Sequence, residues 1–133
     1  MSVRNEQGLI GKALVIWLVI LAVFAVGVLD FASITSTRFH IADLAAQAAT
    51  DGANAYHDGG SQANEKSACD ATRTSLATAD AAIKLVKCSL NTGTGEITIT
   101  VRKVAKTIAV SRIGFLKKFG DVVDTETASP STL

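Results

Sequence analysis

The segment ALVIWLVILAVFAVGVL occupies residues 13–29 and carries no charged side chain. With residues 9–11 before it, and with Lys12 reaching toward the polar surface, the apolar run extends over residues 9–29. A helix that rises about 1.5 Å per residue needs about 20 residues to cross the hydrocarbon layer of a membrane. The run is apolar on every face, so it does not indicate an amphipathic surface helix. The sequence therefore predicts one transmembrane helix at residues 9–29.

Charged residues on either side of this run predict its orientation. Arg4 and Lys12 precede it and Asp30 follows it, so the positive-inside tendency places residues 1–12 in the cytoplasm. Two alternatives are a buried core helix and a signal peptide cleaved near residues 25–27. The rest of the chain is too small and polar to surround a core helix. The run also exceeds the length of about 7–15 residues that is usual in a signal peptide. These arguments favour a retained signal anchor.

The helix is predicted to continue beyond the membrane through residues 30–56. This stretch contains no Pro and no Gly before Gly52. Small residues recur at helical spacing in its second half, at Ala45, Ala48, Gly52 and Ala55. Small side chains let another element approach the helix backbone closely. That element is either the rest of the same domain or a second protein, and the pattern allows both interpretations.

A glycine-containing break at residues 57–61 is followed by a predicted small extracytoplasmic domain, residues 57–128. A second helix is expected from Asn64 to Val86 or a little short of it. Its expected buried face carries Ala68, Ala71, Ser75, Ala79, Ala82 and Val86, with Leu76 and Ile83 beside it. The predicted fold class is α+β, in which this helix packs on a small antiparallel β-meander.

The meander is predicted from a change of the apolar period to two. Ile97, Ile99 and Val101 alternate with polar residues and indicate a half-buried strand. The expected elements are a strand over residues 85–90, a turn over 91–95, a strand over 96–102, a short helix or apolar loop over 111–119, a last strand over 121–127 and a flexible tail over 129–133.

The two cysteines, Cys69 and Cys88, are predicted to form a disulfide. From Cys69 to about residue 82 the expected helix advances about 20 Å, at about 1.5 Å per residue. An extended chain from there to Cys88 returns about 20 Å, at about 3.3 Å per residue. Both cysteines then lie at about the same level, which fits a disulfide in an extracytoplasmic location. The alternative is two unpaired buried thiols, whereas no Cys-x-x-Cys motif indicates a redox pair.

No residue pattern predicts an enzyme. The chain has no phosphate-binding glycine loop, nucleophile elbow or His-Glu-x-x-His motif. His57 lies near Asp51 and Asp58, but one histidine with neighbouring carboxylates is weak evidence for a metal site. We therefore expect no catalytic, cofactor-binding or metal-binding residues. The net charge of +1, from 13 Lys and Arg against 12 Asp and Glu, argues against a nucleic-acid partner.

Basic residues concentrate in residues 84–118, where Glu96 is the only acid. The basic residues there are Lys84, Lys87, Arg102, Lys103, Lys106, Arg112, Lys117 and Lys118. One interpretation is a set of solvated strand faces balanced by the acidic helices. The other is a basic surface that faces anionic lipid headgroups or an acidic partner.

The run IADLAAQAATDGA, residues 41–53, follows the anchor, Asp30 and the basic Arg38. This order resembles the TadE/TadG-like minor pilins and pilus-assembly proteins of the tight-adherence system. Those proteins typically have an anchor ending in an acidic residue, a basic step, and an Ala-rich run ending in Gly-Ala. Residues 95–101 and 115–120 are similar as well. The resemblance spans most of the chain and implies a pilin-like architecture in the bacterial inner membrane.

One position departs from the pilin pattern. Prepilin-like members carry a Glu five residues after a processing Gly, but here Ala13 follows Gly8 and Ile16 follows Gly11 at that distance. The departure favours a membrane-anchored accessory over a fibre subunit.

The expected function is that of a non-enzymatic, single-pass envelope protein in a pilus or secretion machinery. The alternative is an accessory subunit of a membrane transport complex, such as a lipid or solute importer. A third interpretation is a domain secreted after signal cleavage. The expected partners are other integral membrane proteins and membrane lipid.

Overall fold

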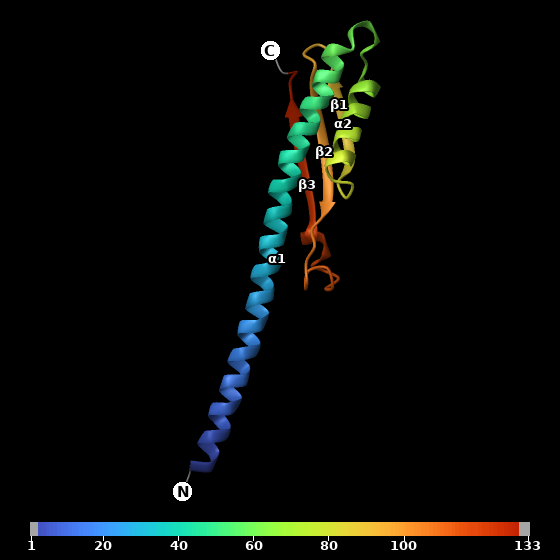
Figure 1. Cartoon of the computed structure of the whole chain (residues 1–133). Coiled ribbons are helices and arrows are strands. Elements are labelled where there is room, and N and C mark those ends of the chain that lie inside the picture. The colour runs from blue at the N-terminus through green and yellow to red at the C-terminus, as the bar shows by residue number, and fades with distance from the viewer. Residues whose placement is uncertain (1–2, 131–133) are drawn as a thin grey trace.

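One helix, α1 (Val3–Asp58), continues without a break through 56 residues, which is about 84 Å at about 1.5 Å per residue. The computed structural model describes residues 3–130. Residues 1–2 of the expected cytoplasmic segment and residues 131–133 of the expected tail lie outside the described residues. A small α+β domain folds against the C-terminal half of α1, and the N-terminal half extends away from it (Figure 1). This architecture confirms the predicted α+β fold class.

The second helix, α2 (Glu65–Ala79), is shorter than predicted. It follows a 3-10 helix at Gly60–Gln62 and begins with a capping box. In this box Ser67 N donates to Asn64 Oδ1 at 2.8 Å, and Asn64 N donates to Ser67 Oγ at 3.1 Å. The helix ends at Ala79. Its C-cap residue, Asp80, has an extended backbone, and the Asp80 carboxylate accepts from the N–H of Ala82 at 2.9 Å. The chain therefore turns toward the sheet well before Val86.

The buried face of α2 also differs from the predicted one. It carries Ala68, Thr72 and Leu76, whereas Ala71 and Ser75 are only partly buried. Thr72 can be buried because its hydroxyl donates to the carbonyl of Ala68 at 3.1 Å. The observed buried stripe therefore lies about one residue further around the helix than the predicted one.

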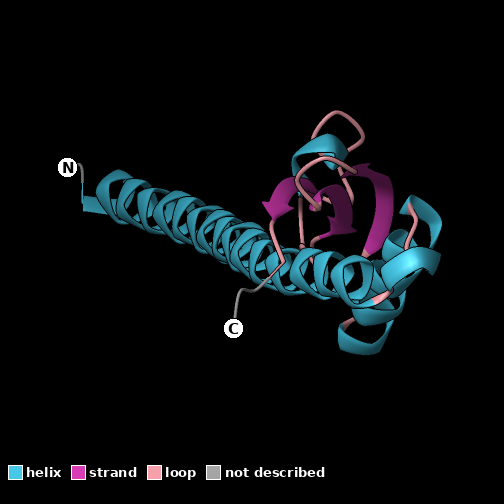
Figure 2. Cartoon of the chain, turned by 90° about the horizontal axis from the view of Figure 1, so that it is seen from above, coloured by secondary structure: helices cyan, strands magenta, loops and turns pink. Residues whose placement is uncertain are grey.

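Three strands form an antiparallel sheet in the order β1-β2-β3, namely β1 (Lys84–Asn91), β2 (Glu96–Val104) and β3 (Asp121–Ala128). Both long helices lie on the same side of the sheet (Figure 2). Ile97, Ile99 and Val101 point toward them and are fully buried, as their alternation predicts. The opposite face carries hydroxyl pairs Thr98–Thr127 at 2.9 Å and Thr100–Thr125 at 3.0 Å, together with exposed Val104 and Val123.

Residues 105–120 leave the sheet between β2 and β3, and we call them the basic loop. The loop includes turns and a 3-10 helix at Lys117–Gly120. Its ends are joined by a hydrogen bond from Ala105 N to Gly120 O at 2.7 Å. The loop lies beside α1 at the end of the domain that is nearer to the N-terminal half of the helix (Figure 1).

Candidate membrane-interface site

The N-terminal half of α1 is a candidate membrane anchor. Among the described residues, α1 is the one helix that is long and apolar enough to cross a membrane. Large apolar side chains in this half, such as Trp17 and Phe24, are more than half exposed. A continuous apolar surface of this size is rarely left in water. A lipid bilayer would supply an apolar surrounding for residues 9–29, which makes this segment a candidate membrane anchor.

Asp30, the first residue after this segment, holds the basic loop. Its carboxylate accepts backbone N–H groups from Ile108 at 2.6 Å, Ala109 at 2.8 Å and Val110 at 2.9 Å. Only 3% of Asp30 is exposed. The hydroxyl of Ser33, almost one helical turn further, donates to the carbonyl of Lys106. These contacts join segments that lie 73 to 80 positions apart in the sequence. The sequence marked Asp30 as the end of the anchor but did not indicate this role.

An apolar groove of about 690 Å³ lies between α1 and the basic loop. The groove is lined from α1 by Ala22, Val23, Val26, Gly27, Asp30, Phe31 and Ile34, and from the loop by Ala109, Val110, Ile113 and Leu116. Asp30 is its only charged lining residue, and the carboxylate is bonded to the loop backbone. The groove continues the apolar surface of the candidate anchor up to the loop.

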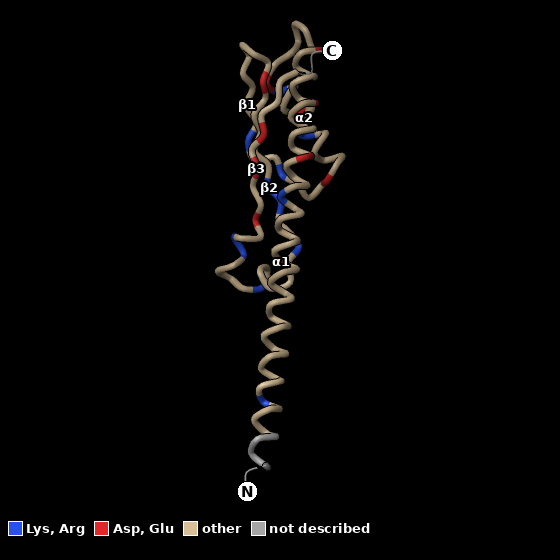
Figure 3. Tube along the Cα trace, turned by 90° about the vertical axis from the view of Figure 1, so that its left-hand side faces the viewer, with Lys and Arg blue, Asp and Glu red and all other residues tan. Residues whose placement is uncertain are grey.

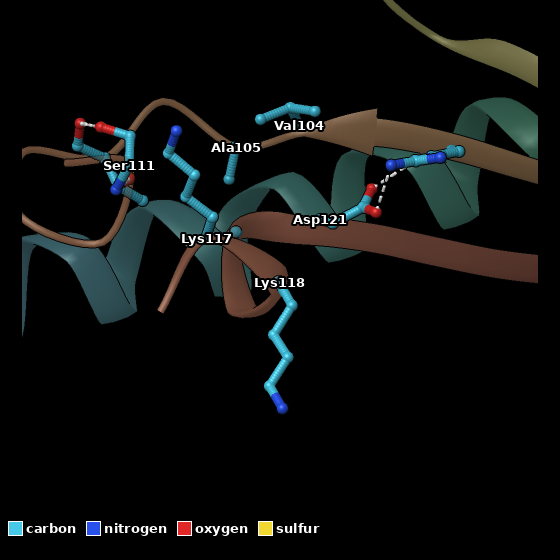
Figure 4. Close-up of a pocket in the computed structure, with 9 residues that line it drawn as sticks. Val104, Ala105, Ser111, Lys117, Lys118 and Asp121 are labelled. Carbon is cyan, nitrogen blue, oxygen red and sulfur yellow. Dashed lines mark hydrogen bonds and ion pairs between the residues drawn. The ribbon is translucent and has the colours of Figure 1, made fainter. Parts of the chain in front are cut away.

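A second, basic pocket of about 470 Å³ lies where the loop joins the sheet (Figure 4). The guanidinium of Arg102 is paired with the carboxylate of Asp121, with two N–O distances of 2.6 Å. Lys117 points into the region near Ser111 and Ala105, whereas Lys118 extends away from them (Figure 4). The pocket is therefore lined by one neutralised cation and by two lysines that form no ion pair in the described structure.

The predicted small-residue stripe packs inside the chain. Ala45, Ala48 and Gly52 are buried, and Ala55 is partly exposed. A Cβ placed on Gly52 would lie 2.9 Å from the carbonyl oxygen of Ala68 and still closer to the hydroxyl of Thr72. The stripe thus allows α2 and the sheet to approach α1, which is the first of the two interpretations. A second protein would have to contact another surface of α1.

The structure joins Cys69 on α2 to Cys88 on β1 in a disulfide, with a Cα–Cα distance of 6.0 Å. The bond links the second helix to the edge strand of the sheet. No free cysteine remains among the described residues.

Titratable groups in the described part of the domain form small clusters. Asp80 accepts from Lys103 and lies 3.2 Å from the His40 ring. The hydrogen bond from Lys103 holds the pKa of Asp80 below its usual value, and the N–H of Ala82 adds to this. Burial raises the pKa of Glu126, and the adjacent Asp124 carboxylate adds to the effect. Within residues 3–130, no group of three or more His, Cys, Asp or Glu side chains is placed to hold a metal ion.

Comparisons with protein-family models, with curated proteins and with solved structures found no match to this chain.

Proposed function

We propose that this chain is a non-enzymatic, single-pass envelope protein of the bacterial inner membrane. In this proposal the N-terminus is cytoplasmic, the small domain is extracytoplasmic, and the protein is a structural or assembly component of a pilus- or secretion-type machinery. The orientation is supported by the basic residues before the anchor and by the disulfide, which forms in oxidising compartments.

The observation that carries the proposal is the continuity of α1. The helix that supplies the apolar segment at residues 9–29 also supplies Ile41, Ala45 and Ala48 to the core of the domain. No turn or glycine-rich linker separates the two parts. The domain is therefore held at a fixed height and orientation relative to the anchor, which suits a component that must pack in register with its neighbours.

An exposed aromatic residue on α1 is the proposed contact with such a neighbour. Phe39 lies nine residues after Asp30, about 13 Å along the helix at about 1.5 Å per residue, and is 73% exposed. It thus lies beyond the expected hydrocarbon layer. Exposed aromatic side chains are enriched at protein–protein interfaces. Because the small-residue stripe is already occupied, we assign lateral contact to the part of α1 that carries Phe39.

The second candidate function, an accessory subunit of a membrane transport complex, is favoured by one observation. Ala13 and Ile16 occupy the positions where a fibre-forming prepilin would carry Glu. An accessory subunit bound beside a permease would need the anchor and the rigid domain, but it would not need that carboxylate.

Site-specific photo-crosslinking in native membranes tests these proposals. A photoreactive phenylalanine analogue replaces Phe39 in one variant and Ala77, an exposed residue of α2, in the control. Adducts at position 39 with a pilus motor, platform or pilin protein support the first function. Adducts with a permease or its ATPase support the second. If position 39 gives no protein adduct beyond those of position 77, the lateral contact is refuted for both.

A further inference from the structure

We propose that the basic loop, residues 105–120, binds anionic phospholipid headgroups in the leaflet at which α1 emerges from the membrane. The loop would then be a second membrane contact that keeps the domain down on the bilayer surface. This inference rests on the proposed function insofar as α1 must span the bilayer.

The first argument for this proposal is the position of the loop relative to the membrane. Asp30 binds it directly at the end of the apolar segment. The groove between loop and helix reaches down to Ala22, which is eight residues, or about 12 Å, before Asp30. The headgroup layer on each side of a bilayer is only about 5–8 Å thick. Loop residues Ile113 and Leu116, which line this groove, therefore lie at the level of headgroups and upper acyl chains.

The second argument for this proposal is the positive charge of the loop. The loop contains Lys106, Arg112, Lys117 and Lys118 and no acidic residue. None of these four forms an ion pair within the part of the chain that the structure describes. Figure 3 marks basic positions on this loop, which lies beside α1 where the long stretch with few charged positions ends. We do not count Arg102, which lies on β2, among the cations available to lipid, because the Asp121 carboxylate neutralises it.

Apolar side chains on the same loop distinguish a lipid surface from an acidic protein. Phe115 is 75% exposed, and Phe119 is also exposed, with the Lys118 ammonium 5.6 Å from its ring centre. Aromatic and basic side chains together are typical of membrane–water interfaces, where rings enter the headgroup layer and cations meet phosphates. The loop places both kinds of side chain at the membrane-proximal end of the domain, where a soluble partner would compete with the bilayer itself.

Quenching by brominated phospholipids tests the inference on the full chain in nanodiscs. Trp17 is the only tryptophan, and its fluorescence reports on the apolar segment of α1 at residues 9–29. A Trp17→Phe, Phe115→Trp variant reports on the loop. We expect position 115 to be quenched by bromine near the headgroups, and more so as phosphatidylglycerol replaces phosphatidylcholine. Formation of the Cys69–Cys88 disulfide shows that each variant has folded.

Two variants, each of which removes one positive charge, test whether the basic side chains of the loop cause the dependence on phosphatidylglycerol. In the reporter background, Lys117→Gln should raise the phosphatidylglycerol fraction needed for half-maximal quenching about fivefold, the usual effect of one basic residue near an anionic surface. Lys87→Gln, an equal change of charge on β1, should leave it unchanged. Equal quenching at position 115 with and without phosphatidylglycerol would overturn the inference, as would equal effects of the two variants. If Trp17 itself escapes quenching by deeply brominated lipid, the proposed anchor fails instead.

Discussion

Gly52→Ala is the smallest change that should disturb the packing of the domain on α1. The added methyl carbon would lie 2.9 Å from the Ala68 carbonyl oxygen, 2.9 Å from Ile97 Cδ1, and closer still to Thr72 Oγ1. The end of the Ile97 side chain can move, but the Ala68 carbonyl belongs to the backbone of α2. Helix α2 must therefore shift away from α1, which loosens the contact that buries Thr72.

The expected cost follows from two opposing effects. Overpacking a well-packed core typically costs about 1–3 kcal/mol. Replacing Gly by Ala inside a helix favours the helix by about 1 kcal/mol. We therefore expect a net loss of up to about 2 kcal/mol in the free energy of unfolding, and a larger loss for Gly52→Leu. At Gly27, where an added Cβ meets nothing within 4 Å, the same change to Ala should cause no loss.

The assay is a urea titration of the full-length protein in detergent micelles, followed by far-UV circular dichroism. A double-mutant cycle with Thr72→Ala locates the strain, because that variant removes the hydroxyl nearest to the new methyl group. Gly52→Ala should cost clearly less in the Thr72→Ala background. Additive effects, within about 0.3–0.5 kcal/mol, or a stabilising Gly52→Ala, would show that the two helices are not in tight contact at this position.

The remaining predictions concern the disulfide, the contacts of Asp30 with the basic loop, and the pH dependence of stability. The double variant Cys69→Ser, Cys88→Ser should lower the free energy of unfolding by about 3 kcal/mol, the value that the chain-entropy model gives for a separation of 19 residues. The same urea titration measures this loss. An unchanged urea midpoint would contradict a stabilising disulfide between these residues. Asp30→Asn should weaken the three amide contacts, so that Ile108, Ala109 and Val110 exchange their amide hydrogens faster, while the amides of β2 serve as the unchanged control. Because burial raises the pKa of Glu126, its contribution to stability is complete at pH values below its unfolded pKa and is lost as pH rises through the raised folded pKa. The Glu126→Gln variant should therefore have a higher free energy of unfolding than the unmodified chain at neutral pH, and this difference should disappear in acid. A difference in the free energy of unfolding that stays constant from neutral to acid pH would refute this prediction.

The elements with strong local patterns were predicted from the sequence. The alternation of Ile97, Ile99 and Val101 predicted the buried face of β2, and the uninterrupted stretch after Asp30 predicted the continuation of α1. The end of α2 was missed because Asp80 stops the helix through contacts with Ala82 and Lys103. Only one of these two residues is close to Asp80 in the sequence.

The sequence by itself determined the apolar segment, the helical continuity of α1 and the meander, because periodicity and turn residues act over a few positions. The tertiary structure alone decided that the small-residue stripe of α1 receives α2, that Thr72 rather than Ala71 is buried, and that Asp30 holds a loop 78 residues away. These features depend on segments that meet only after folding. Backbone N–H groups, which Asp30 binds, are present at nearly every position of every chain, so no pattern of side chains could have indicated which of them it would find.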